Sequence, residues 1–420
     1  MYRVTQLKNG LTVATAEMPH MASVSVGLWV GVGGRYEAAA SSGICHFIEH
    51  MLFKGTRRRN AHEISQAVEG IGGYLNAFTS EEHTCFYARA GHDHLAGLYD
   101  VLTDMALHSR FDARDINKER DVIKEELAMY LDQPAVRVQE VLHETLWPDQ
   151  PLGRPLTGSE KTLDAMNRAA LVEYLRTHYV TGNTLVAAAG RVRHKDLVAL
   201  SAKFGAKFNN GKRPVFTPAL AEQKAPQLRL ESRTTEQTQL ALGVRVCSRH
   251  DERRYALRVL NVLLGENTSS RLFQVIREEQ GLAYSVQSSI TLFDDTGVLT
   301  ISAGLDLEKM PHTLKLLMKE MRRLRDKSVS PGELRRAKDY LIGQMDLSLE
   351  GTESQMMWLG EQLLAYGRIF QANEIKHRIR DVTAAQVRAV AQDFFRPERL
   401  NLSLVSPLKS AAGLDKLLRL

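Results

Sequence analysis

The sequence has few cysteines and no long hydrophobic segment. Its three cysteines, Cys45, Cys85 and Cys247, lie far apart in a chain of 420 residues, without the paired spacing of a disulfide framework or a thiolate metal site. They indicate reduced thiols and a cytoplasmic protein. The longest weakly polar run, SVSVGLWVGVGG, is much shorter than the ~20 residues that span a bilayer, and the N-terminus lacks the apolar core of a secretory signal. We therefore expect no membrane partner.

The charge of the chain gives little indication of a nucleic-acid ligand. The formal net charge is +6, and the short basic clusters at Arg57–Arg59 and Arg322–Arg325 lack interleaved aromatic residues or a recognition-helix pattern. We expect these clusters to be solvated surface, and we expect no nucleic-acid partner.

The chain is long enough for more than one domain, and it contains an internal repeat. Periodicity is lost between Gly205 and Pro226, where prolines and an Asn-Asn-Gly sequence predict a linker. Sliding the second half back by 210 residues aligns Tyr284 with Tyr74, and FDARDINKERDVIKEELAMYLD corresponds to VSPGELRRAKDYLIGQMDLSLE at an offset of 218. We expect two homologous domains and a linker, at residues 1–210, 229–420 and 211–228, respectively.

Strand and helix patterns are mixed within each half. Alternating runs such as TVATAEM and HTCFYARA predict strands, and longer segments of 3.6-residue periodicity predict helices. Because the two kinds do not alternate strictly, we expect α+β domains, each with helices packed on a largely antiparallel mixed sheet.

The segment GICHFIEHMLF, residues 43–53, predicts an amphipathic helix with a metal-binding face. Its apolar side chains form one stripe on a helical wheel, in which Phe47, Ile48, Met51 and Leu52 all lie within about 80° of Ile44. His46, Glu49 and His50 project from the opposite face. Two histidines four residues apart can direct their nitrogens to one ion, and a glutamate directly before the second can act as a base. This is the inverted zincin motif, His-x-x-Glu-His; the alternative is a polar face turned to water.

A catalytic zinc ion also needs a third protein ligand. The segment DARDINKERDVIKEELAMY predicts a helix that begins after Asp112. On its wheel Glu125 points to solvent, whereas Glu119 and Glu126 lie on the shoulder of the apolar stripe. These two are ~10 Å apart along the axis, so one can bind the metal while the other supports the site from behind. The wheel alone does not distinguish them.

These motifs resemble the insulinase/pitrilysin family of zinc peptidases, and especially its two-domain members related to the β subunit of mitochondrial processing peptidase. The similarity extends over nearly the whole chain, through GICHFIEHMLFKGT, GGYLNAFTSEEHTCFYARA, ERDVIKEEL, PLGRPLTG and SSRLFQVIREEQGLAYSV. It implies one zinc ion per subunit, bound by His46, His50 and Glu126, with Glu119 as the supporting acid and Glu49 as the general base.

The resemblance also implies how a peptide is held. The substrate would add as an extra strand along GGYLNAFTS, with Asn76 and Ala77 as its nearest contacts. Arg277 and Tyr284 match a pair that binds the cleaved substrate and stabilises its tetrahedral intermediate. The implied activity is a zinc endopeptidase.

The second half is expected to lack a metal site and to serve instead as a wall, a lid or a dimer surface. The three motif residues and Glu126 align with four residues that bind no metal, Ala256, Val259, Leu260 and Gln344. Relatives with four such repeats enclose peptides in one chamber, so the resemblance implies that two of these chains pair and cleave short or unfolded peptides. The pair could be a homodimer or a heterodimer with a related subunit. The alternative is a non-catalytic structural or partner subunit, although such relatives typically lose the motif residues that this chain keeps.

Overall fold

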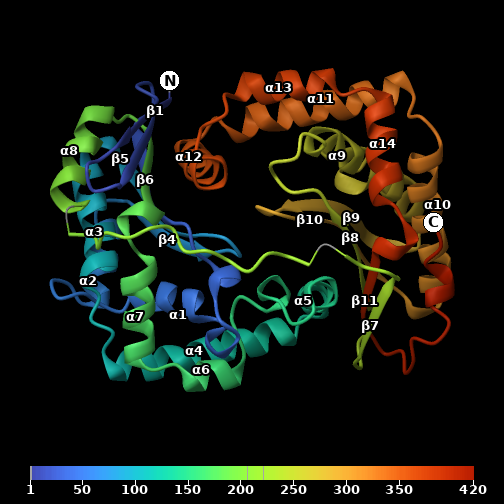
Figure 1. The fold of residues 1–420 in the computed structure, drawn as a ribbon, viewed down its shortest axis with the longest axis horizontal. Coiled ribbons are helices and arrows are strands. Elements are labelled where there is room, and N and C mark those ends of the chain that lie inside the picture. The colour runs from blue at the N-terminus through green and yellow to red at the C-terminus, as the bar shows by residue number, and fades with distance from the viewer. Residues whose placement is uncertain (1, 206, 221) are drawn as a thin grey trace. The chain divides into compact units, whose positions relative to one another are not determined.

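The computed structural model describes residues 2–205, 207–220 and 222–420, which form two compact units (Figure 1). Residues 206 and 221, which fall in the expected first domain and linker, and residue 1 lie outside the described residues. The first unit comprises Met1–Leu127, Arg154–Thr217 and Asp346–Ile369, and the second comprises Ala128–Gly153, Pro218–Met345 and Phe370–Leu420.

The first unit is built on a six-stranded sheet with β4 at one edge. In spatial order its strands are β1 (Tyr2–Gln6), β2 (Thr12–Glu17), β6 (Thr184–Gly190), β3 (Ser23–Val30), β5 (Thr84–Gly91) and β4 (Tyr74–Thr79). Only β2 and β6 are parallel, and the other neighbours are antiparallel. The sheet is therefore mixed and largely antiparallel, as predicted.

Helices cover both faces of this sheet. On one face lie α1 (Ile44–Leu52), α2 (Ala61–Glu69), α3 (Leu95–His108), α4 (Ala113–Leu131), α6 (Glu160–Ala165), α7 (Arg168–His178) and α8 (His194–Gly205). Alternate β3 residues such as Val26 and Leu28 join their apolar core, because successive strand side chains point to opposite faces. The other face packs against α12 (Thr352–Tyr366), where Trp29 of β3 meets Met356 and Leu359.

The second unit repeats this topology in five strands. Their spatial order is β7 (Gln227–Ser232), β11 (Leu400–Ser406), β8 (Thr238–Val246), β10 (Gly297–Leu305) and β9 (Ala283–Leu292), with β7 and β11 parallel and the rest antiparallel. The helices are α9 (Arg254–Asn261), α10 (Met310–Asp326), α11 (Pro331–Ser348), α13 (Ala372–Asp381), α14 (Ala384–Phe394) and, from the first half of the chain, α5 (Pro134–Leu146).

The strand orders confirm the predicted pair of homologous α+β domains. The series β2-β6-β3-β5-β4 matches β7-β11-β8-β10-β9 strand for strand, including the single parallel pair. Tyr74 and Tyr284, which align in the sequence repeat, lie at the start of the corresponding strands β4 and β9.

The two halves of the chain exchange one helix each. Helix α5 packs on β11, β8 and β7 of the second sheet, and α12 packs on β6, β3 and β2 of the first. Relative to the expected domains 1–210 and 229–420, residues 128–153 therefore lie in the second unit and residues 346–369 in the first. The physical reason is that the apolar stripes of these helices are buried on the sheet formed by the other half of the chain.

The packing of α12 on the first sheet can be tested at Gly360. A methyl group at this glycine would overlap the fully buried indole ring of Trp29. We expect Gly360→Ala to lower the free energy of unfolding by about 1–3 kcal/mol, the usual cost of overpacking a core. Gly343→Ala, in exposed α11 with no atom near the added methyl group, is the matched control and should stabilise by about 0.5–1 kcal/mol. Urea unfolding of both variants measures this difference, and equal effects would contradict the packing.

Candidate metal centre

The helix that carries the two histidines is anchored at its N-terminus by a buried carboxylate. α1 begins after Gly43, whose φ of 92° lies in the left-handed region that favours glycine. The Glu37 carboxylate accepts hydrogen bonds from the backbone N–H groups of Gly43 (2.7 Å) and Cys45 (2.9 Å), at the positive end of the helix dipole. Burial raises the pKa of Glu37 to about 7, although these hydrogen bonds oppose the shift. Glu37 thereby fixes the start of α1 next to His46.

The two faces of α1 are divided as predicted. The apolar residues Ile44, Phe47, Ile48, Met51 and Leu52 are buried in the core of the first unit. His46, Glu49 and His50 lie on the other side and are partly exposed. Cys45 packs in the core with its Sγ 3.2 Å from the Tyr174 hydroxyl, so it does not face the site.

His46, His50 and Glu126 converge as a candidate metal-binding cluster. Glu126 Oε2 lies 3.7 Å from His46 Nε2 and 3.6 Å from His50 Nε2, and the three ligand atoms all lie within 4.8 Å of one another. Ligands bonded to a tetrahedral zinc ion at ~2.0–2.1 Å are roughly 3.3–3.5 Å apart. Two imidazoles and one carboxylate are also a donor set of catalytic zinc sites. The cluster therefore fits zinc in both chemistry and spacing.

Glu119 supports His50 from behind. Only 2% of the Glu119 side chain is exposed. Its carboxylate accepts a hydrogen bond from His50 Nδ1 (3.2 Å) and forms an ion pair with Lys54 Nζ (2.8 Å). Burial raises the pKa of Glu119, but its bonds to His50 and Lys54 outweigh burial and hold the pKa below its usual value. An ionised carboxylate can only accept, so in the neutral form of His50 the proton lies on Nδ1 and Nε2 keeps its lone pair. The structure thus separates the two carboxylates that the helical wheel leaves equivalent.

The electrostatics of the two histidines differ. Burial and the charge of His50 lower the pKa of His46 to about 4, which leaves this imidazole neutral and available as a ligand. Burial also opposes the charged form of His50, but hydrogen bonds and charges from Glu119 and Glu126 outweigh it and raise the pKa of His50 to about 9. Glu119 and Glu126 thus favour the protonated form of His50. Their negative charge is also what a bound divalent cation would neutralise.

Glu49 lies between the two histidines on α1 and does not belong to the cluster. Its Oε2 accepts a hydrogen bond of 2.5 Å from the hydroxyl of Thr79, at the end of β4. Burial raises the pKa of Glu49 above its usual value, although the Thr79 hydrogen bond acts in the opposite direction. A raised pKa brings a carboxylate closer to the range in which a general base works best.

Asn76 and Ala77 lie on β4, which has a strand neighbour on one side only. Asn76 is exposed, donates to the Tyr74 hydroxyl (2.6 Å) and accepts from the backbone N–H of Ala77 (2.8 Å). Ala77 packs against the core that contains α1. The strand edge predicted to receive a peptide is thus part of the same unit as the metal cluster.

Arg277 and Tyr284 are brought together in the second unit. The Arg277 guanidinium lies 4.8 Å from the centre of the Tyr284 ring and 4.9 Å from that of Phe273. Arg277 lies on a π-helical turn, Phe273–Glu279, a rare conformation often found at functional sites. The Tyr284 side chain is exposed, at 79% of the residue's surface.

Three supporting residues escaped the sequence reasoning, namely Glu37, Lys54 and Thr79. Lys54 follows His50 by four residues, which is a signal that it lies near the same face. Thr79 follows Asn76 in one strand, but the sequence does not show that its hydroxyl reaches α1. Glu37 precedes α1 in an irregular segment, and its capping role depends on a loop conformation that no periodicity predicts.

Three of the four residues that replace the metal-binding positions in the second half are part of a core, and the fourth, Gln344, is exposed. Ala256, Val259 and Leu260 are buried on α9, and Gln344 lies on α11. In residues 2–205, 207–220 and 222–420, the His46, His50 and Glu126 group is the one cluster of His, Cys, Asp or Glu with metal-binding geometry.

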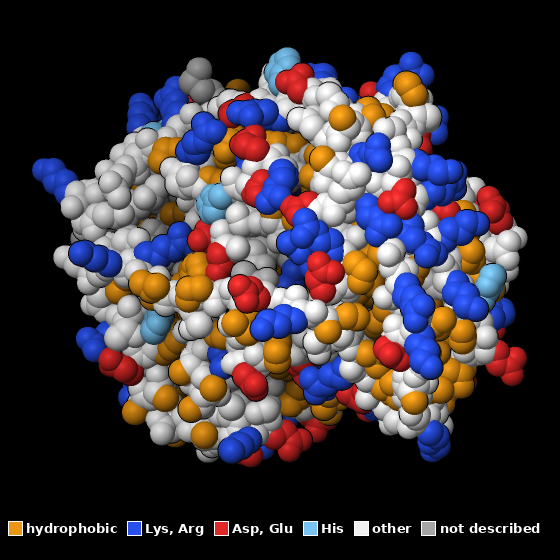
Figure 2. Space-filling model, turned by 45° about the vertical axis from the view of Figure 1, so that its right-hand side comes forward, with side chains coloured by type: hydrophobic (Ala, Val, Ile, Leu, Met, Phe, Trp, Pro, Cys, Tyr) orange, Lys and Arg blue, Asp and Glu red, His pale blue; other side chains and the backbone are white. Residues whose placement is uncertain are grey.

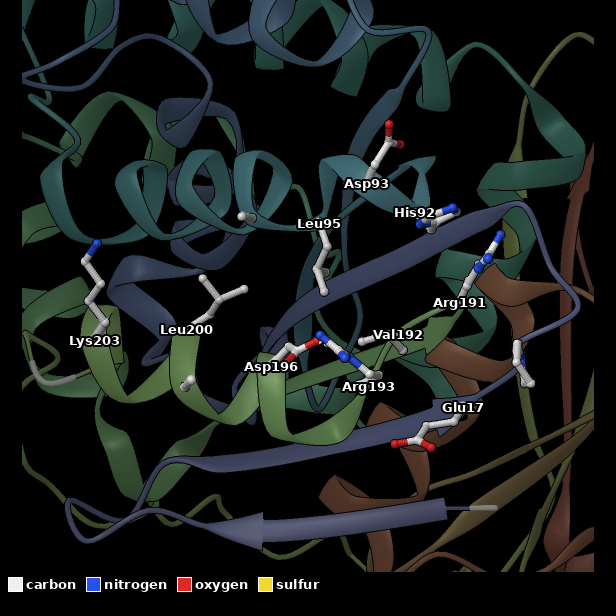
Figure 3. A pocket seen from close by; sticks show the side chains of 13 residues that line it. Glu17, His92, Asp93, Leu95, Arg191, Val192, Arg193, Asp196, Leu200 and Lys203 are labelled. Carbon is white, nitrogen blue, oxygen red and sulfur yellow. Dashed lines mark hydrogen bonds and ion pairs between the residues drawn. The ribbon is translucent and has the colours of Figure 1, made fainter.

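Other surface features lie apart from this cluster. Figure 2 shows Lys and Arg side chains interspersed with Asp and Glu over one face. A pocket of about 850 Å³ in the first unit opens beside the starts of α3 and α8, where Arg193 pairs with Asp196 at 2.6 Å and Leu95 and Leu200 contribute apolar walls (Figure 3). It is lined by none of the candidate ligands. Among the described helices, none has the length and hydrophobicity needed to cross a membrane.

A duplicated α+β fold with His-x-x-Glu-His on one helix and a candidate glutamate ligand on another is the arrangement of an inverted-motif zinc peptidase. The model of the family described as "Insulinase (Peptidase family M16)" matches residues 12–160, and that of the "Peptidase M16 inactive domain" matches residues 165–341. The chain is 39% identical to an uncharacterized zinc protease of Mycobacterium tuberculosis, over 99% of this chain and 96% of the relative. It is 35% identical to the uncharacterized zinc protease YmxG of Bacillus subtilis, over 95% and 97%.

Solved structures share the fold over nearly the whole chain. A protease from Helicobacter pylori has a TM-score of 0.90 at 20% identity, covering 97% of this chain and 100% of that one. A Pseudomonas fluorescens structure described as a peptidase M16 inactive domain has a TM-score of 0.90 at 19% identity, covering 97% and 99%. The chain belongs to the M16 insulinase family of peptidases, and its curated relatives are named zinc proteases.

Proposed function

We propose that the protein is a zinc-dependent endopeptidase that hydrolyses short or unfolded peptides. The observation that carries this proposal is the convergence of His46, His50 and Glu126 around one point, with the carboxylate of Glu49 on the same helix face. The sequence similarity to proteins named zinc proteases supports the same chemistry.

Each residue of the site has a distinct role in this proposal. Zinc, when bound, would acidify water and polarise a peptide carbonyl group. His46, His50 and Glu126 would hold the ion, one per subunit, and Glu119 fixes the tautomer of His50. Glu49 would accept the proton of the attacking water and then deliver it to the leaving amine.

The substrate would be bound mainly through its backbone. A peptide that adds as a strand to the free edge of β4 gains main-chain hydrogen bonds with little demand on its sequence. Its nearest contacts would be Asn76 and Ala77, and binding would displace the Asn76 side chain from the Ala77 N–H group. Arg277 and Tyr284 would donate to the cleaved residue and to the developing oxyanion.

A second candidate function is a non-catalytic structural or partner subunit of a peptidase complex. The domain described as inactive covers residues 165–341, the half in which the metal ligands are absent from the sequence repeat. The first half retains the proposed metal ligands His46, His50 and Glu126 and the proposed base Glu49, which favours the catalytic proposal.

Metal removal tests the proposed activity directly. We expect about one zinc ion per chain by elemental analysis, and cleavage of a library of short internally quenched peptides. Treatment with a zinc chelator should abolish cleavage, and added zinc should restore it, because the proposed water activation requires the ion. Protein that binds no zinc and cleaves no peptide of the library would contradict the proposal and favour the non-catalytic role.

We also propose that two chains, identical or related, form one active chamber, with Arg277 and Tyr284 of one subunit serving the zinc site of the other. If so, mixing Glu49→Gln subunits with Arg277→Ala subunits should recover activity, because one site of each mixed dimer has both intact parts. Each parent variant alone is the control. Mixtures that never exceed the more active parent would argue that the Arg277 function is supplied within one chain or not at all.

A further inference from the structure

The hydroxyl group of Thr79 holds one oxygen of the Glu49 carboxylate. Thr79 Oγ1 lies 2.5 Å from Glu49 Oε2, and because a carboxylate only accepts, the threonine is the donor. A hydrogen bond to an ionised carboxylate is charge-assisted, and such bonds are stronger than those between neutral groups. No other hydrogen bond to Glu49 is found within the described part of the chain, so Oε1 is left without a protein partner.

The donor is itself fixed by its strand. Leu75, Ala77 and Thr79 alternate along β4, and the first two pack against the core that contains α1, so Thr79 faces this helix as well. The opposite residue on β5, Thr84, is buried and donates to the Val32 carbonyl group at 3.0 Å, while the two threonine hydroxyls are 3.4 Å apart. A β-branched side chain in a strand has few χ1 rotamers. The Thr79 hydroxyl is therefore directed to Glu49 by the sheet rather than by α1.

We propose that Thr79 is a positioning residue for the general base, an inference that rests on the proposed role of Glu49. By holding Oε2, Thr79 would restrict the rotation of the carboxylate and leave Oε1 as the oxygen that takes the proton of the attacking water. The bond joins α1, which carries the base, to β4, the strand whose free edge would receive the peptide. Strand and base are thus held in one fixed relation before any substrate binds, which is the preorganisation that proton transfer needs.

The test compares Thr79→Val with Thr79→Ser. Valine keeps the shape of threonine but has no donor, so kcat should fall about 10- to 100-fold, the order expected for a displaced catalytic group. KM and the zinc content should stay unchanged, because neither the β4 backbone nor the metal cluster is altered. Serine restores the hydroxyl and should recover most of kcat. The matched control is Thr5→Val on β1, the opposite edge strand, whose hydroxyl contacts His194 at 2.8 Å and should leave kcat unchanged.

The outcomes separate this inference from the proposed function. A wild type that cleaves no peptide contradicts both. An active wild type with an inactive Glu49→Gln variant, but with Thr79→Val within twofold of wild-type kcat, overturns the role of Thr79 alone. A loss of kcat that Thr79→Ser does not recover, or that is accompanied by loss of zinc or by a lower Tm than that of Thr5→Val, would also overturn it in favour of a purely structural role.

Discussion

Replacing Glu49 by glutamine is expected to lower kcat for peptide hydrolysis by about a hundred- to ten-thousand-fold, the usual contribution of a general base. Glutamine has nearly the same size and its carbonyl oxygen can still accept from Thr79, so the fold around α1 should be kept. Its amide cannot accept the proton of the attacking water. Because Glu49 is not part of the His46, His50 and Glu126 cluster, zinc should remain bound at the wild-type stoichiometry.

The measurement is kcat on the best peptide of the library, together with elemental analysis of zinc. Glu125→Gln is the matched control, because Glu125 is an exposed carboxylate on α4 next to Glu126 and its replacement should leave both values unchanged. A Glu49→Gln variant that retains zinc and cleaves at a rate within a few-fold of the wild type would remove Glu49 from the mechanism.

Glutamine at position 126 should affect zinc more than glutamine at position 119. Glu126 contributes the oxygen that approaches both Nε2 atoms, so Glu126→Gln removes a charged ligand and should weaken zinc binding by more than about 100-fold. Glu119 touches Nδ1 of His50 on the side away from the cluster, and the loss of such a support typically weakens metal binding by about 10- to 100-fold. Peptidase activity measured at limiting zinc should fall in the same order.

Competition with a chromophoric chelator gives the zinc affinity of each variant, again with Glu125→Gln as the control. Excess zinc should restore activity to Glu119→Gln but not to Glu126→Gln, since only the first retains all three ligands. If Glu119→Gln loses more zinc than Glu126→Gln, the assignment of ligand and supporting acid must be reversed.

Much of the metal centre follows from local periodicity. The helical wheels of α1 and α4 separate buried from accessible positions correctly, because each helix is amphipathic and packs on one side. The choice between Glu119 and Glu126 could not be made in this way, since both lie on the same shoulder of α4. It depends on the distances from each carboxylate to the rings of His46 and His50, and these distances are set by how α1 and α4 cross.

The exchange of α5 and α12 between the two halves could not be predicted from sequence patterns either, because it also depends on which elements pack together. The buried stripe of α5, with Val138, Val141, Leu142 and Leu146, would fit the face of either sheet. An apolar stripe predicts that a helix is buried on one side, but it does not predict which sheet the helix packs against. The internal repeat correctly predicted two similar domains, yet it cannot show that each domain takes a helix from the other half of the chain.

The position of α12 determines the order in which the first unit can be completed during synthesis. All three proposed zinc ligands have left the ribosome once residue 126 has emerged. Trp29, in contrast, packs against Met356, which is synthesised 327 residues later. Until α12 has been synthesised, the apolar sheet face around Trp29 is not packed against this helix. Contacts between residues so far apart in the sequence also form slowly. We therefore expect that nascent chains carry an assembled zinc site before the opposite side of the same sheet is closed.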